Sequence, residues 1–530
     1  MDRRHFLSHS ISASAIALAT DRARARAKAE LDELTIEQIQ EHFKAGRLSS
    51  RSLTEHYVTR IHQLDMAGPR TNAVIELNPD AVDIADRLDR ERKRTGGRGP
   101  IHGVPVLIKD NIDTSDRMIT SAGSLALIAN RAVADAFLVR RLRAAGAVIL
   151  GKTNLSEWAN FRSTHSVSGW SGRGGQTHNP YALDRNPSGS SSGTSVAVSA
   201  NFCAAGVGTE TDGSIVSPSS INGVVGVKPT VGLISRSGVI PISASQDTAG
   251  PIARSVRDAA ILLRVLAAPD PEDAAAMPDN KELDYVSSLD ARTLRGARIG
   301  VARRFFGFNS AVDKYIEDCL TAMKKEGVEL VDPVDVPNQG KFGDEEYIVM
   351  LYEFKAGVDA YLARAPATVS VRSLSDVIAF NTKYYKNEMP WFGQDIMTQS
   401  AEKGPLTDDA YLKARRNAKR MAGAEGIDAA MDKHKLDALV APTESPAWLT
   451  DLITGDHSTG GCSQFAAVAG YPHITVPAGF VHGLPIGISF FGRAWSEPAL
   501  LGIAYGFEQV MNARRAPEFL ETLNLGEHSA

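Results

Sequence analysis

Short, continuous apolar runs alternate with amphipathic stretches from about residue 100 onward. A short apolar run without polar alternation is typical of a strand that is buried on both faces of a sheet. The stretches between the runs, such as residues 136–145, repeat their apolar positions at helical spacing. We therefore predict one large α/β domain, with a mixed, mostly parallel sheet sandwiched between helices. The predicted strands cover residues 104–108, 147–150, 224–227, 438–440, 474–476 and 486–491.

Two helix starts are predicted before the sheet. Thr35 with Gln38, and Ser52 with Glu55, each pair a capping hydroxyl with a side chain that can reach back to the cap. Apolar residues follow each pair at helical spacing, so we expect both helices to pack on the outside of the sheet.

The domain is expected to span residues 28–520, with a variable region at about 270–435. A stretch rich in proline and acidic residues, 268–284, marks the best break in the pattern. A polar, largely helical and aromatic region follows it and runs to about residue 435. We expect this region to form a cap or pocket wall, which would set the width of the pocket.

Residues 1–27 differ from the rest of the chain. Arg3 and Arg4 open the segment, a short apolar stretch follows at residues 11–20, and small residues suitable for cleavage lie at 25–27. The pattern resembles a twin-arginine export signal, and it is too short for a stable membrane span of about 20 apolar residues. We expect a periplasmic or secreted protein without a stable membrane anchor; a disordered basic tail on a cytoplasmic protein is the alternative.

Charge and cysteine content exclude several classes of protein. The 58 basic and 62 acidic residues give a net charge of −4, which argues against a nucleic-acid partner. Cys203, Cys319 and Cys462 lie far apart, so neither a disulfide framework nor a paired-cysteine metal site is expected. We interpret them as buried packing residues.

Two serine-rich loops carry the most distinctive chemistry. One is Gly-Ser-Ser-Ser-Gly at residues 189–193, and the other spans residues 208–215 and contains Ser214. A helix is expected between them at 194–205, followed by a turn at the glycines of 206–208. Small residues leave backbone N–H groups free to surround an oxyanion, and Lys109, after a buried apolar run, could serve as a base if burial lowers its pKa. Acyl transfer by serine and lysine is therefore the leading hypothesis.

Other sites fit the sequence less well. Residues 189–193 also match a G-x-S-x-G motif that would make Ser191 the nucleophile, but a polar, proline-bounded loop precedes them instead of a strand. Lys152 and Lys228 lack the spacing of a phosphate-binding loop. Structural or rim positions are expected for three histidines near the motifs, His102, His165 and His178.

On these motifs the chain resembles the amidase signature family. The segment at residues 103–111 matches the family's lysine segment, and residues 189–193 and 208–218 match its serine- and glycine-rich signature. The similarity runs from about residue 34 to residue 509. Further matches lie at residues 151–154, 226–230, 250–254 and 476–480.

The resemblance implies a role for each residue of the motifs. Ser214 would be the nucleophile, Ser190 a bridging serine held by a cis peptide bond, and Lys109 the general base. Ser191 and Thr209 would support the lysine, and neither a metal nor an organic cofactor is implied. The oxyanion hole would be formed by the backbone N–H groups of Thr211, Asp212, Gly213 and Ser214.

Two positions depart from the family pattern. Many members have glycine where this chain has Asp212, which puts a carboxylate beside the expected hole. Members that bind acidic substrates or transfer ammonia from glutamine often have arginine where this chain has Val216. A substrate with a free carboxylate is therefore disfavoured.

The resemblance favours a hydrolase of small or peptide amides that forms an acyl-enzyme intermediate. Residues 352–355 and 389–394 resemble segments of members that deamidate C-terminal peptide amides. A broad acylamidase acting on aliphatic or aryl amides is the main alternative. A catalytically inactive binding protein, or a component of a transamidation complex, is the alternative from another class.

Overall fold

The computed structural model describes residues 31–276 and 284–523. The predicted export signal at residues 1–27 lies outside the described residues. None of the helices in the described ranges has both the length and the apolar content needed to cross a membrane.

A sheet of eleven strands forms the centre of the described structure. Nearly all of its central positions are buried, as expected from the continuous apolar runs. In spatial order the strands are β1 (Val74–Leu77), β3 (Val148–Thr153), β2 (Pro105–Lys109), β6 (Ala205–Glu210), β8 (Thr248–Ala253), β7 (Val225–Lys228), β12 (His473–Val481), β13 (Leu484–Phe491), β11 (Ala438–Pro442), β9 (Arg298–Val301) and β10 (Glu329–Val331). A separate two-stranded ribbon contains β4 (Trp170–Ser171) and β5 (Gly175–Gln176).

The sheet is mixed, and its α/β character confirms the expected fold class. Parallel pairing joins β3, β2 and β6, and also β11, β9 and β10. The other six of the ten neighbouring pairs in this sheet are antiparallel, so parallel pairing is less common than in the mostly parallel sheet that was predicted. Each strand predicted from the sequence lies within or overlaps an observed strand.

The glycines at residues 206–208 do not form the predicted turn, because they belong to strand β6. A Cβ on Gly206 would lie 2.5 Å from Thr194 Cγ2, and one on Gly208 would lie 2.7 Å from Ser191 Oγ. The glycines therefore allow helix α6 (Ser192–Ser199), which is shorter than predicted, to pack closely on the strand.

Helices α2 (Ile36–Lys44) and α3 (Ser50–Arg60) correspond to the two predicted helix starts. The capping box of Thr35 with Gln38 is confirmed. The second box is wrong in register, since Ser49 is the N-cap and Ser52 is its partner three residues later. Ser49 has the extended backbone that lets its hydroxyl accept the N–H of Ser52.

Further helices flank the sheet and connect its strands. Helices α8 (Val256–Leu266) and α17 (Glu497–Met511) pack on the central strands and on each other, whereas α7 (Val216–Ile221) packs on β7, β12 and β13. The helices are α4 (Ala81–Thr95), α5 (Phe137–Ala144), α7 (Val216–Ile221), α8 (Val256–Leu266), α9 (Ser310–Lys325), α16 (Gln464–Ala469) and α17 (Glu497–Met511). Short 3₁₀ or π segments lie at Ile61–Asp65, Leu125–Leu127, Glu157–Asn160, Ala291–Leu294, Arg303–Phe305 and Gly423–Asp428.

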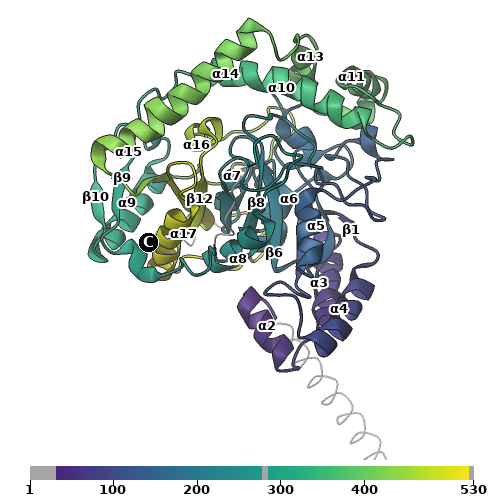
Figure 1. Ribbon diagram of the computed structural model, residues 1–530, viewed down its shortest axis with the longest axis horizontal. Coiled ribbons are helices and arrows are strands. Elements are labelled where there is room, and N and C mark those ends of the chain that lie inside the picture. The colour runs from purple at the N-terminus through teal and green to yellow at the C-terminus, as the bar shows by residue number, and fades with distance from the viewer. Residues whose placement is uncertain (1–30, 277–283, 524–530) are drawn as a thin grey trace, which may run out of the picture.

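The region after residue 341 forms a row of helices that we call the helical arch. In Figure 1 these green helices curve over one side of the molecule, and the purple helices α2 to α4 lie at the other side. Packing of α10 (Gly343–Ala363) against α13 (Asp395–Ala401) and α14 (Asp409–Ala422) holds the arch together. It consists of α10 (Gly343–Ala363), α11 (Leu374–Lys383), α12 (Tyr385–Glu388), α13 (Asp395–Ala401), α14 (Asp409–Ala422) and α15 (Ala429–His434).

Candidate active site

Lys109 is the last residue of β2, and its side chain is fully buried. Its Nζ lies 2.7 Å from Ser190 Oγ and 3.1 Å from Ser191 Oγ. It also lies 2.9 Å from the hydroxyl and 3.2 Å from the carbonyl oxygen of Thr209. All four contacts are neutral oxygen atoms, and in the part of the chain that the structure describes no carboxylate pairs with the amine directly.

This environment changes the protonation of Lys109. Burial lowers the pKa of Lys109 to about 7, while the more distant carboxylates of Glu210 and Asp247 act in the opposite direction. Desolvation dominates because the ammonium ion loses its water and gains no contacting anion. Near neutral pH a large share of the lysine is therefore uncharged and able to accept a proton.

Ser190 lies just before the start of α6. The Gly189–Ser190 peptide bond is cis, as the resemblance implied. The Ser190 carbonyl accepts the N–H of Ser156 at 3.2 Å, and a Cβ on Gly189 would lie 2.2 Å from Ser156 Oγ. Close packing thus holds the Ser190 hydroxyl toward the lysine.

The second serine loop meets the first through the backbone. The N–H of Ser191 donates to the carbonyl oxygen of Ser214 at 3.1 Å, which brings the two predicted loops together. The Ser214 side chain is largely buried, at 7% exposure for the residue. Within the described residues, no hydrogen bond joins Ser214 Oγ to Ser190 or Lys109.

Glu210 fixes the turn that carries Ser214, and sequence reasoning missed it. Its carboxylate accepts the N–H groups of Ile215 and Val216 at 2.7 and 3.0 Å, where helix α7 begins. These are donors that a helix start leaves without intrahelical partners. The available signal was a glutamate shortly before a glycine within the predicted serine loop.

The backbone before α7 offers unused donors. The N–H groups of Asp212, Gly213 and Ser214 donate to no acceptor among the described residues. Gly213 has a φ of 77°, which allows the sharp turn at this point. A row of free donors beside a serine is suited to binding an oxyanion.

Asn111 and Asp247 support the residues around the lysine. Asn111 Nδ2 donates to Thr209 Oγ1 at 3.0 Å, and Thr211 Oγ1 donates to Asp247 Oδ1 at 2.6 Å. Thr209, Thr211 and Asn111 also line a cavity of 470 Å³ that extends toward helix α10. The cavity is large enough for a small ligand and lies directly beside the lysine's hydroxyl partner.

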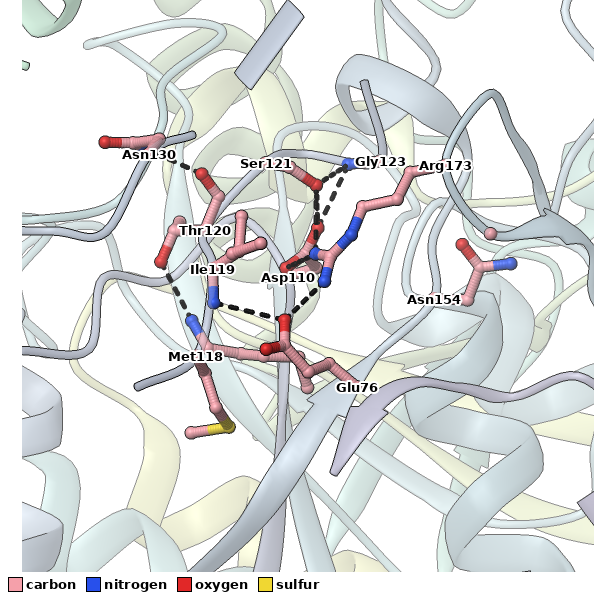
Figure 2. Close-up of polar contacts among 12 residues, drawn as sticks. Glu76, Asp110, Met118, Ile119, Thr120, Ser121, Gly123, Asn130, Asn154 and Arg173 are labelled. Carbon is pink, nitrogen blue, oxygen red and sulfur yellow. Dashed lines mark hydrogen bonds and ion pairs between the residues drawn. The ribbon is translucent and has the colours of Figure 1, made fainter. Parts of the chain in front are cut away.

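An acidic and basic network lies at the end of β2 (Figure 2). Asp110 is buried and accepts hydrogen bonds from Ser121 Oγ and from the N–H of Gly123, the latter at 3.2 Å. Arg173 lies 3.2 Å from Asp110 and also pairs with Glu76. The network fastens strand β1 and two loops to the end of β2, and it thereby fixes Lys109, which precedes Asp110 in the chain.

The histidines near the motifs do not take part in the site. Buried His102 has its Nε2 2.9 Å from the carbonyl oxygen of Leu88, and His178 Nδ1 lies 2.8 Å from that of Leu183. In the described ranges no cluster of three or more histidine, cysteine or acidic side chains is arranged to hold a metal. The three cysteines are buried and unbridged, as predicted.

Comparison with known proteins shows the family to which the chain belongs. The family model described as Amidase matches residues 52–501. A solved peptide amidase from Stenotrophomonas maltophilia is 52% identical with a TM-score of 0.87, covering 92% of this chain and 99% of that one. A probable amidase of Arabidopsis thaliana is 42% identical over 502 residues, which is 92% of each chain.

Amidotransferase subunits are also related to this chain, at lower sequence identity than these amidases. A glutamyl-tRNA(Gln) amidotransferase subunit from Halorhodospira halophila is 34% identical, covering 93% of this chain and all of that protein. The family model covers most of the chain, and the full-length relatives include amidases at 42% and 52% identity. The chain therefore belongs to the amidase signature family and is a hydrolase that acts on amides.

Proposed function

We propose that the enzyme hydrolyses amides through Ser214, Ser190 and Lys109. Ser214 Oγ attacks the carbonyl carbon, and its proton passes through Ser190 to the uncharged amine of Lys109. The backbone N–H groups of residues 211–214 donate hydrogen bonds to the developing oxyanion. The 2.7 Å contact between Lys109 Nζ and Ser190 Oγ is the observation that carries this proposal.

The second half of the reaction returns the proton. As the C–N bond breaks, Lys109 gives the proton back through Ser190 to the leaving nitrogen, which departs as ammonia or an amine. The acyl group remains as an ester on Ser214. Water then attacks the ester and loses its proton to the Ser190 and Lys109 pair, and the acid leaves as Ser214 regains its proton.

We further propose that C-terminal peptide amides are the preferred substrates. The 52% identity to a peptide amidase over nearly its full length supports this substrate class. Tyr352 and Glu353, from the segment that resembles such enzymes, lie on α10 of the helical arch. The cavity of 470 Å³ has room for a short peptide segment.

Ammonia release from a matched panel tests this substrate assignment. The panel contains N-acylated peptide amides, the corresponding free amino-acid amides and anilides of the same acyl groups. Peptide amides are expected to give the highest kcat/KM, with Ser214→Ala as the inactive control. Faster turnover of anilides would instead support the broad acylamidase, and glutamine-dependent ammonia transfer to a charged tRNA would support the transamidation component.

Export by the twin-arginine route is also proposed, from the paired Arg3 and Arg4 in the sequence. Changing both residues to lysine should retain the enzyme in the cytoplasm of a bacterial host. Unchanged recovery from the periplasm would contradict the proposal.

A further inference from the structure

Asp212, one of the two departures from the family pattern, faces a second carboxyl group. Its side chain lies within hydrogen-bonding reach of Glu346, which belongs to helix α10 in the helical arch. Glu346 is 3% exposed, and Asp212 Oδ1 is enclosed by protein although the residue as a whole is only partly buried. The contact thus connects the loop of the proposed oxyanion hole to the arch.

Both carboxyl oxygens of Glu346 already accept hydrogen bonds from side-chain amides. Gln246 Nε2 lies 2.9 Å from one carboxyl oxygen, and Gln464 Nε2 lies 2.8 Å from the other. Asp212 has Ser463 beside it, yet its Oδ1 has no donor among the described residues. Two carboxylates cannot bond to each other without a proton, and an enclosed acceptor without a donor is costly.

We propose that Asp212 and Glu346 share one proton, and that this pair is a positioning device for the proposed oxyanion hole. The inference rests on the proposed function, because it assigns a role to the residue that precedes Gly213 and Ser214. The shared proton keeps the pair at a single negative charge. It also ties the hole-forming loop to α10, so the loop is fixed when the carbonyl oxygen of the substrate becomes negative.

The surrounding charges favour this state at neutral pH. Burial, followed by the neighbouring Asp212 carboxylate, raises the pKa of Glu346 to about 8. Lys228 on β7 is the cation that faces Asp212, while Glu210 and Cys462 also lie close enough to interact with it. As the pH rises through about 8 the shared proton is lost. The second negative charge then repels the other carboxylate of the pair and also a forming oxyanion.

A similar pair elsewhere provides a matched control. Glu388, at the end of α12, lies within hydrogen-bonding reach of Glu157, and its Oε2 also lacks a donor in the described structure. Glu157 is buried against Arg162, and Glu388 Oε1 accepts the N–H of Leu125 at 2.6 Å. This pair also connects the arch to the core, but it includes no residue of the serine loops.

The test is the alkaline side of the pH profile of kcat/KM. The wild type should lose about tenfold per pH unit above the pKa of the shared proton, as one essential proton requires. Glu346→Gln, which cannot lose a proton, should remove this descending limb, as should Asp212→Asn. Glu388→Gln should keep the limb, even if its melting temperature falls.

The possible outcomes are distinct. A descending limb that persists in folded Glu346→Gln and Asp212→Asn, or a wild type without one, would overturn the proposal. If either variant folds poorly, infrared spectra of Glu388→Gln decide the question, because this variant lacks the second carboxyl pair. Its protonated-carboxyl band should disappear over the same pH range, and the absence of such a band overturns the proposal. Failure of the proposed function would appear differently, as amide hydrolysis that survives Ser214→Ala at every pH.

Discussion

Two buried lysines on neighbouring strands have different surroundings. Lys109 on β2 contacts the hydroxyls of Ser190, Ser191 and Thr209. Lys152 on β3 is equally buried, but its Nζ donates to the carbonyl oxygen of Ile112 and to a threonine hydroxyl, and acidic side chains face it.

Burial lowers the pKa of both lysines, so burial alone does not distinguish a base from a structural cation. Carboxylates oppose this effect at both sites, Glu210 and Asp247 at Lys109, and Asp110 and Asp113 at Lys152. The difference lies in the direct contacts, because among the described residues Lys152 Nζ donates to no serine hydroxyl. Lys109 instead contacts hydroxyls of a serine loop that is bonded to the Ser214 loop. A base therefore needs both desolvation and a hydroxyl from which it can take a proton.

Loss of the proposed nucleophile, Ser214, should reduce activity more than any other single change. Ser214→Ala should lower kcat by about 10⁴-fold or more, because the residues of such a site act as a unit. The variant should fold normally, since only one hydroxyl is removed. Steady-state ammonia release and a melting curve check both statements, and turnover close to the wild type would remove Ser214 from the mechanism.

Replacing each lysine separately tests whether only Lys109 acts as a base. Lys109→Met should reduce kcat/KM by about 10³-fold and abolish the rise of activity with pH near 7, because no amine remains to lose its proton. Lys152→Met should instead cost about 1–3 kcal/mol of stability, because buried acceptors lose their donor.

The folded Lys152→Met enzyme should keep the rise of kcat/KM with pH near 7, which is the ascending limb of the pH profile. Profiles of kcat/KM against pH for both variants distinguish the two roles. The assignment would be reversed if the limb survived in Lys109→Met and disappeared in Lys152→Met.

A smaller effect is expected from the acidic network in Figure 2. Arg173→Gln removes the cation that links Asp110 to Glu76, so the end of β2 should be held less firmly. We expect kcat/KM to fall by about tenfold, a loss of about 1.4 kcal/mol, with the midpoint of the ascending limb unchanged.

Arg117→Gln is the matched control, because Arg117 forms an exposed ion pair with Asp80. Exposed pairs contribute little to stability or geometry. An ascending limb displaced in Arg173→Gln would show that the network sets the protonation of Lys109 as well as its position.

The sequence was most informative where a residue's neighbours along the chain determine its structure. Continuous apolar runs indicated the strands, and the position of Lys109 after such a run was compatible with the burial that a lysine base requires, which the structure shows. Hydroxyl and glycine density marked both serine loops. The capping box at Thr35 could be predicted because all of its members lie within one turn.

Contacts between distant segments could not be read from local patterns. The glycines of β6 suggest a turn when only the local sequence is considered. Their role is to let helix α6 pack closely on the strand. Glu346 became a partner of Asp212 only through the packing of the helical arch on the core. Such contacts depend on tertiary packing, which a single sequence encodes only indirectly.

The central claim is that Ser214 carries the acyl group while Lys109 accepts its proton. The most direct test is peptide mapping by mass spectrometry of enzyme quenched during turnover of an activated ester that shares the acyl group of a good amide substrate. We predict one acyl adduct, located on Ser214, with accumulation that increases with pH through about 7 in the wild type and is lost in Lys109→Met. An adduct on Ser190 or Ser191, or equal acylation of Ser214 in Lys109→Met at every pH, would contradict the mechanism.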